Sequence, residues 1–114
     1  MRVIIAGSRD IYLTTSEVAK LLHKHNLSPT EIVCGMAKGV DKSGLNWAKS
    51  HNIPVKRFHP NWDKFGLRAG PLRNEQMAEY GEVLLLIWTG KSKGSANMKQ
   101  NMMKLNKQIF EEIV

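Results

Sequence analysis

Apolar residues occur in two patterns that follow one another along this chain. Residues 2–6, which are apolar from Val3 on, and residues 83–88 are runs typical of strands covered on both faces of a parallel sheet. Between such runs, apolar residues recur at helical spacing, as on a helix that packs against a sheet. This alternation predicts an α/β domain, a Rossmann-like arrangement of three layers in which helices cover both faces of the sheet.

The predicted elements follow the order strand–helix four times and end with a fifth strand. The predicted strands cover residues 2–6, 31–34, 53–58, 83–88 and 108–114. The predicted helices cover residues 15–25, 40–51, a segment that starts near Pro71, and 95–105. The two apolar runs belong at the centre of the sheet, and Pro54 favours an edge position for its strand. Thr14 and Glu17 have capping-box spacing before the first helix.

Length and charge limit the class of protein. The chain has 114 residues, which predicts one domain over residues 1–114. Its 17 Lys and Arg residues exceed its 10 Asp and Glu residues, for a formal net charge of +7. This excess favours anionic partners such as phosphates, nucleotides or nucleic acid, although a solvated basic surface also accounts for it. No apolar run approaches the ~20 residues of a membrane helix, and the strand pattern starts at once, so we expect a cytoplasmic protein without a signal peptide or membrane contact.

The sequence contains no recognisable catalytic or metal-binding set. The four histidines lack metal-ligand spacing with cysteines or carboxylates, and no serine lies in a G-x-S-x-G motif. Cys34, the single cysteine, lies within a predicted strand and is expected to be a buried, inert thiol. We therefore predict no catalytic residue, no metal and no cofactor.

Two loops at strand carboxyl ends carry candidate ligand-binding residues, because parallel sheets bind ligands at that edge. Glycine lets the backbone approach a ligand, arginine binds phosphate bidentately, and a helix N-terminus attracts anions. The alternative is a pair of ordinary turns with exposed charges, and Asp41 is either a helix cap or a ligand for a ribose hydroxyl. The candidates in these loops are Gly7, Ser8, Arg9, Gly35, Ala37, Lys38, Gly39 and Asp41.

Two further segments complete the predicted site. Residues 59–70 show no periodicity and are predicted to form a long loop, which in a small domain is often functional. In and after it, Trp62 either packs in the core or stacks on a base, and Arg73 and Asn74 fall in the first turn of the third helix. The loop after residues 83–88 has the composition of a phosphate-binding loop, or of a flexible basic loop. Its candidates are Thr89, Gly90, Lys91, Ser92, Lys93, Gly94 and Ser95.

Taken together, these motifs resemble the YspA-like branch of the SLOG superfamily, which also contains the LOG phosphoribohydrolases and the DNA-processing protein DprA. The resemblance rests on residues 3–10, 33–41, 47–48, 53–55, Trp62, 69–74 and Met77. It implies a Rossmann-like sheet of order 3-2-1-4-5. It also implies a nucleotide site between the loops and the third helix, and a homo-oligomer with sites near the interface.

The sequence departs from the LOG enzymes at two positions. LOG enzymes carry an Arg-Lys pair at the start of the corresponding helix, whereas here Asn74 follows Arg73. They also carry a P-G-G-x-G-T-x-x-E motif, of which Gly94 and Ser95 match the Gly-Thr pair, but Met98 stands in place of the catalytic glutamate. A hydrolysis that depends on that glutamate cannot be transferred to this chain.

Three hypotheses follow, and the sequence leaves open whether the chain is an enzyme. The first is a module that senses or sequesters a phosphorylated nucleotide, such as an ADP-ribose derivative or a cyclic nucleotide. The second is a LOG-type nucleotide N-glycosidase or phosphohydrolase that recruits Asp41, Asp63 or Glu75 as its acid. The third is a single-stranded nucleic-acid binder, which the lack of an aromatic stacking platform disfavours. We expect the source to be a bacterium or a bacteriophage.

Overall fold

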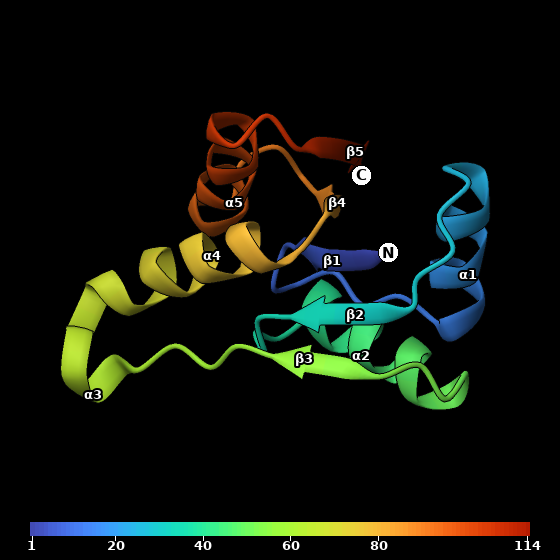
Figure 1. Ribbon diagram of the computed structural model, residues 1–114, viewed down its shortest axis with the longest axis horizontal. Coiled ribbons are helices and arrows are strands. Elements are labelled where there is room, and N and C mark those ends of the chain that lie inside the picture. Colours follow the sequence, from blue (N-terminus) through green and yellow to red (C-terminus); the bar gives the residue numbers. More distant parts are fainter.

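The computed structural model describes all 114 residues and shows a sheet between two layers of helices (Figure 1). Its strands are β1 (Arg2–Gly7), β2 (Glu31–Cys34), β3 (Val55–Arg57), β4 (Val83–Trp88) and β5 (Gln108–Ile113). All five strands are parallel, in the order β3-β2-β1-β4-β5. The predicted fold class and strand order are therefore confirmed, as are the central position of β1 and β4 and the edge position of β3.

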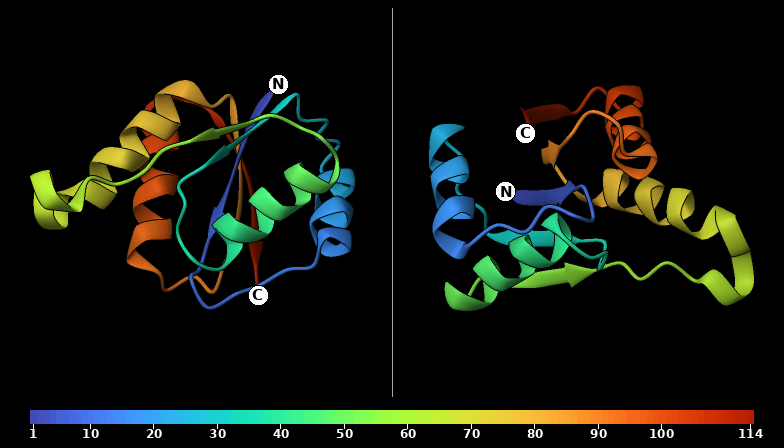
Figure 2. Two further views of the ribbon diagram at one scale, coloured as in Figure 1. Left: turned by 90° about the horizontal axis from the view of Figure 1, so that it is seen from below. Right: turned by 180° about the vertical axis from the view of Figure 1, so that it is seen from behind.

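Helices cover both faces of the sheet. They are α1 (Thr15–Lys24), α2 (Val40–Ser50), α3 (Trp62–Phe65), α4 (Ala69–Tyr80) and α5 (Lys93–Lys104), with a short 3₁₀ helix η1 (Gly66–Arg68). Figures 1 and 2 show α1 and α2 on one face, α4 and α5 on the other, and α3 extending from the body. None of the helices has the length and apolar character that crossing a membrane requires.

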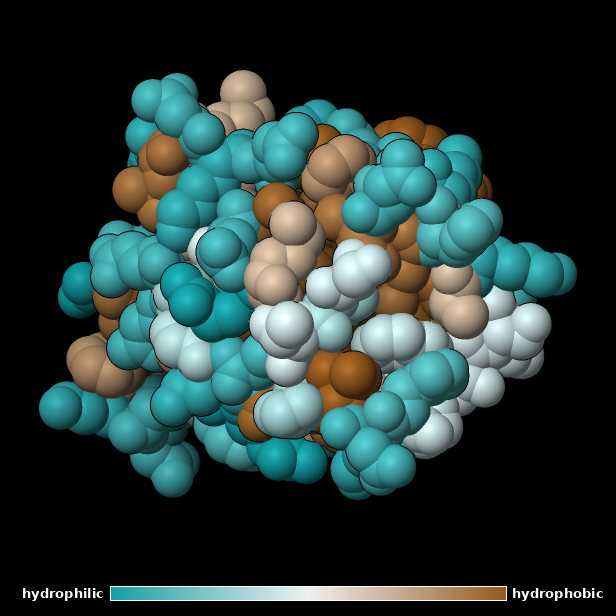
Figure 3. Space-filling model, turned by 45° about the vertical axis from the view of Figure 1, so that its right-hand side comes forward, coloured by the Kyte–Doolittle hydropathy of each residue, from teal (hydrophilic) through white to brown (hydrophobic).

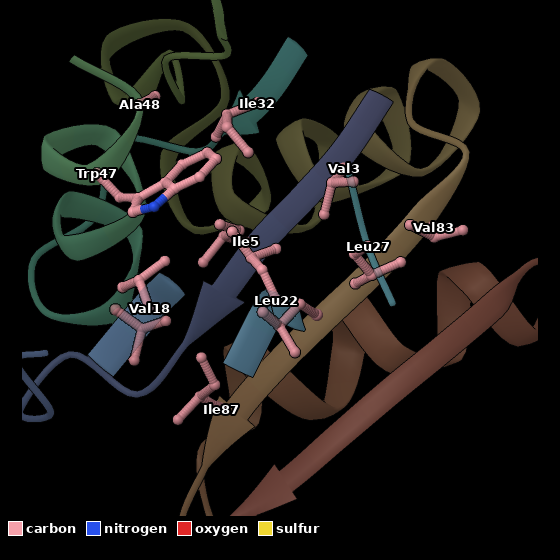
Figure 4. Packing of buried hydrophobic residues seen from close by; sticks show 12 residues of the cluster. Val3, Ile5, Val18, Leu22, Leu27, Ile32, Trp47, Ala48, Val83 and Ile87 are labelled. Carbon is pink, nitrogen blue, oxygen red and sulfur yellow. The ribbon is translucent and has the colours of Figure 1, made fainter. Parts of the chain in front are cut away.

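The core divides into two clusters because successive side chains of a strand point to opposite faces of the sheet. From β1, Val3 and Ile5 join the cluster beneath α1 and α2, which contains Trp47 (Figure 4). Ile4 joins the other cluster, beneath α4 and α5. Outside the core, the face in Figure 3 is largely hydrophilic, with its apolar surface in small separate patches.

Cys34 lies at the end of β2 and is fully buried, as predicted. Burial raises the pKa of its thiol to about 11. The thiolate, which is the reactive form of cysteine, is therefore scarce at neutral pH.

The structure corrects several element boundaries, two of them through a side-chain cap. The third helix, predicted to start near Pro71, begins at Ala69, so Arg73 and Asn74 lie in its second turn and not in its first. The third strand spans Val55–Arg57 and not residues 53–58. Residues 59–70 were predicted to be a loop, but they contain α3 and η1, because the side chain of Asn61 accepts a hydrogen bond from the Lys64 amide at 3.2 Å and starts α3. The last helix was predicted to start at residue 95, but Ser92 is its N-cap. Residues 93–95 therefore belong to the first turn of α5 and not to a loop. The predicted capping box of Thr14 and Glu17 is present at α1.

Gly7, where β1 ends, provides a test of backbone packing. A Cβ atom built on Gly7 would lie 1.7 Å from the carbonyl oxygen of Ile87 in β4, so the strands must separate to admit it. We expect Gly7→Ala to lower the free energy of unfolding by about 3 kcal/mol or more, the upper end for overpacked sites.

The matched control is Gly94→Ala, because a Cβ atom there meets no atom within 4 Å. Its unfolding free energy should stay within about 1 kcal/mol of the wild type, since alanine is the better helix former. Urea denaturation followed by circular dichroism measures both values. Equal losses in the two variants would contradict this account of Gly7.

Candidate functional site

A cleft of about 210 Å³ lies at the carboxyl ends of the strands. We call it the strand-end cleft. Four segments distant in sequence form its wall: the end of β1 with the loop that follows it, the loop after β2 with the first turn of α2, the middle of α4, and the first turns of α5. Nine of the predicted site residues line it, namely Gly7, Arg9, Ala37, Asp41, Arg73, Asn74, Ser92, Gly94 and Ser95. The fold thus gathers in one cleft half of the eighteen residues that were selected separately from four loops.

Two outer grooves adjoin the strand-end cleft and share Arg9 and Arg73 with it. One, of about 230 Å³, is also lined by Lys93, and the other, of about 180 Å³, by Lys38. Trp62 on α3 lines both of these outer grooves and is 48% exposed. The alternative in which Trp62 packs in the core is therefore wrong.

Arg73 is held from both sides by the protein. One guanidinium nitrogen, Nη1, donates a hydrogen bond to the carbonyl oxygen of Gly35, and Nε donates to Oδ1 of Asn74 at 3.0 Å. Burial lowers the pKa of Arg73, and the nearby Asp41 carboxylate opposes this change. Arginine stays protonated in proteins despite such shifts. The site therefore contains a fixed positive charge that is not a freely solvated surface group.

Asp41 is a buried acid in the wall of the strand-end cleft. It is 4% exposed, and its carboxylate accepts a hydrogen bond from the Ala37 amide at 3.3 Å. The N-cap of α2 is Gly39, so Asp41 is not the helix cap that was one of its two sequence interpretations. Burial raises the pKa of Asp41 to about 6, although the Ala37 amide and Arg73 act in the opposite direction.

The N-terminus of α5 carries a partial positive charge, in contrast to the acidic Asp41. Ser92 caps the helix by accepting a hydrogen bond from the Ser95 amide at 3.3 Å. The Ser95 residue is 4% exposed, lines the strand-end cleft, and has a hydroxyl oxygen without a hydrogen-bond partner. Buried hydroxyl groups nearly always have a partner. The positive end of a helix beside an unpartnered hydroxyl is a suitable place for an anionic oxygen of a ligand.

Three predicted residues do not line the cleft but contact the segments that form its wall. Ser8 is buried, and its hydroxyl accepts a hydrogen bond from the Thr89 amide at 3.3 Å. Gly35 supplies the carbonyl oxygen that holds Arg73. Gly39 has a φ of +78°, and a Cβ atom there would lie 2.3 Å from the carbonyl oxygen of Ser8. Ser8 thus joins the loop after β1 to the end of β4, and Gly39 lets the loop after β2 pack closely against the loop after β1.

Three other predicted residues lie away from the strand-end cleft and the outer grooves. Thr89, Gly90 and Lys91 are exposed between β4 and α5, and the Lys91 amide bonds to the Thr89 hydroxyl in a local turn, at 3.4 Å. They line neither the strand-end cleft nor the outer grooves.

Sequence reasoning missed one polar residue at the site. Asn97 accepts a hydrogen bond from the Asn74 side chain at 2.9 Å and lines the outer groove that contains Lys93. Its position, three residues after Gly94 on α5, places it on the same helix face and was the available signal.

The five-stranded parallel sheet defines a Rossmann-like domain, and the cleft lies at the carboxyl edge of the sheet. The YAcAr model, described as the YspA, cpYpsA-related SLOG family, matches residues 1–65, and the chain belongs to this family. No curated protein matches the sequence.

The structure is similar to the X-ray structure of DNA processing protein A (DprA) from Streptococcus pneumoniae. The TM-score is 0.74 at 18% sequence identity, and the match covers 96% of this chain. The chain spans about half the length of that protein, because the match covers 49% of it. At this identity the similarity shows the fold alone.

Neutralising Asp41 should stabilise the domain at neutral and higher pH. Its carboxyl has a pKa of about 6 in the folded protein and an ordinary value of 3.8. The stability gained from this raised pKa is fully present below the unfolded value and is lost as the pH rises through about 6. We therefore expect Asp41→Asn to raise the free energy of unfolding at about pH 8 by roughly 2–3 kcal/mol.

Urea denaturation at a series of pH values measures this effect. The gain should disappear near pH 4, where the wild-type carboxyl is protonated in the folded protein. Glu79→Gln, at an exposed position on α4, is the control with the same loss of charge, and should show neither the gain nor its pH dependence. A pH-independent change in Asp41→Asn would refute the role of burial.

Proposed function

We propose that residues 1–114 form one nucleotide-binding domain, which senses or sequesters a phosphorylated nucleotide or a signalling ligand derived from one. One observation carries this proposal: Arg9, Arg73 and the N-terminus of α5, with its unpartnered Ser95 hydroxyl, converge on one small cleft. Guanidinium groups and helix N-termini are the groups that proteins use to bind phosphate.

The outer grooves extend this arrangement beyond a single phosphate. Lys38 and Lys93 each line one of them, so a second phosphate has a cation on either path out of the cleft. Trp62 offers an exposed aromatic surface beside both lysines, and aromatic side chains stack on nucleobases. Together these groups favour a ligand that combines phosphate with a base.

Hydrolysis by a LOG-type mechanism receives less support. Met98, at the position of the LOG glutamate, lines the strand-end cleft with a side chain that cannot transfer a proton. Asp41 is the one carboxylate in the lining, because Asp63 and Glu75 line other depressions. An enzymatic function would therefore depend on Asp41 alone, and binding without turnover is our first proposal.

Nucleic-acid binding is the alternative that the structural comparison favours. The similar protein is named for DNA processing, and the net charge of +7 suits a polyanion. Trp62 is, however, the one aromatic side chain that lines the outer grooves, whereas single-strand binders stack successive bases on several. A single nucleotide therefore matches this site better than a strand of nucleic acid does.

We further propose that the domain is a cytoplasmic homo-oligomer. Phe65 on α3 and Leu67 on η1 are exposed, on the segment that extends from the body. Apolar side chains gathered on a protruding segment are typical of contact surfaces.

Thermal shift with a ligand panel tests the proposed function. The panel contains mononucleotides, nucleoside triphosphates, ADP-ribose, NAD, cyclic dinucleotides and short single-stranded DNA. A ligand at 100 times its dissociation constant adds about 2.7 kcal/mol, which raises the melting temperature of a domain of this size by roughly 10 °C. A salt-sensitive shift with DNA and none with small nucleotides would overturn the proposal in favour of the alternative.

Arg73→Ala should abolish the shift produced by a small nucleotide, because it removes the half-buried cation that lines the cleft. The control is Lys104→Ala, which removes an equal charge at the far end of α5 and should leave the shift intact. Arg73→Lys keeps the charge without the bidentate geometry and should give an intermediate shift. An undiminished shift in a folded Arg73→Ala variant would show that the ligand lies elsewhere.

A further inference from the structure

The strand-end cleft is too small for a whole nucleotide. Its volume is about 210 Å³, whereas pockets that enclose a complete small ligand begin at about 300 Å³. Its apolar lining comes from alanine and methionine, and no aromatic side chain is part of it. Trp62, the aromatic residue nearby, lies in the outer grooves. The cleft therefore suits the phosphate and sugar of a nucleotide, while the base belongs outside against Trp62.

A cleft that bound only phosphate would gain nothing from Asp41. A carboxylate repels phosphate, and its burial raises the pKa of this group, so the folded protein is less stable at neutral pH for having it. Asp41 is not explained by an ion pair either, since the ion pairs of the protein involve Glu111 and Glu112. A buried carboxylate in the lining calls for a hydrogen-bond donor on the ligand.

The geometry of the lining narrows that donor to one chemical group. An ionised carboxylate has room for about four hydrogen bonds. The Ala37 amide occupies one position of Asp41, at 3.3 Å, and the Gly7 amide also lowers the pKa of this carboxyl, so positions remain for a ligand. Phosphate oxygens of a nucleotide are acceptors at neutral pH, and the base lies outside the cleft. The donors that remain on the ligand are the hydroxyl groups of the ribose.

We infer that the strand-end cleft selects ribonucleotides, with Asp41 accepting hydrogen bonds from the ribose hydroxyls while Arg73 and the N-terminus of α5 hold the phosphate. This inference rests on the proposed function and adds a sugar requirement and a tolerance for the base. Base tolerance follows because stacking on one exposed tryptophan does not read hydrogen-bonding edges.

Calorimetric titration with AMP and its 2′-deoxy and 3′-deoxy analogues tests the sugar requirement. A hydrogen bond to a charged group is worth about 10- to 100-fold in affinity, so at least one deoxy analogue should bind that much more weakly than AMP. In Asp41→Asn the ratio between AMP and that analogue should fall to within a fewfold. The ratio is the informative quantity, because a general disturbance of the cleft would weaken all three ligands alike.

Glu79→Gln serves as the charge-matched control and should keep the wild-type ratio. UMP, GMP and CMP should bind within about tenfold of AMP, since stacking strength differs modestly among bases. Binding of AMP should also quench tryptophan emission, because Trp62 is exposed whereas Trp47 and Trp88 are buried. Ribose 5-phosphate, which lacks a base, should bind without that quenching.

The outcomes separate the inference from the function on which it rests. Equal binding of AMP and both deoxy analogues would overturn the sugar requirement and leave nucleotide binding in place. Discrimination that persists in a folded Asp41→Asn variant would overturn the role of Asp41. Failure of every nucleotide and of ribose 5-phosphate to bind would overturn the proposed function itself.

Discussion

The site depends on the close contact between the loops that follow β1 and β2. The Val40 amide donates a hydrogen bond to the carbonyl oxygen of Ser8 at 3.2 Å, and Gly39 passes so near that only a left-handed glycine fits there. This contact fixes the N-terminus of α2 against the end of β1. Arg9 and Asp41, from segments that are far apart in the sequence, therefore face one cleft.

The elements were predictable from the sequence because local signals determine them. β1 is apolar from Val3 on and β4 is apolar throughout, and the capping box of Thr14 and Glu17 marks the start of α1. α3 was missed because four residues are too few to show a helical period, and its start depends on the single Asn61 cap. The onset of α5 was placed two residues late because Ser92 was taken for a loop residue instead of an N-cap.

The candidate site was predictable to the level of loops but not of side-chain roles. Topology places all strand carboxyl ends at one edge, so the four loops had to converge. Spacing could not show that Ser8 faces the Thr89 amide, or that the glycine turn at Gly90 lies beside the cleft and not in it. Such distinctions arise from tertiary packing, which is also what buries Asp41 and leaves the Ser95 hydroxyl without a partner.

The burial of Asp41 bears on the relation between this domain and its structural neighbour. A shared fold at 18% identity leaves the chemistry of the cleft free to differ. Asp41 has a pKa of about 6 because it is buried, so its ionised form lowers the stability of the fold at neutral pH. Proteins keep such a destabilising group where function requires it. A strand of DNA lacks the 2′-hydroxyl and carries a free 3′-hydroxyl only at its end, so it cannot supply a vicinal pair of donors. The buried carboxylate therefore argues for a ribose ligand and against a DNA strand in this cleft.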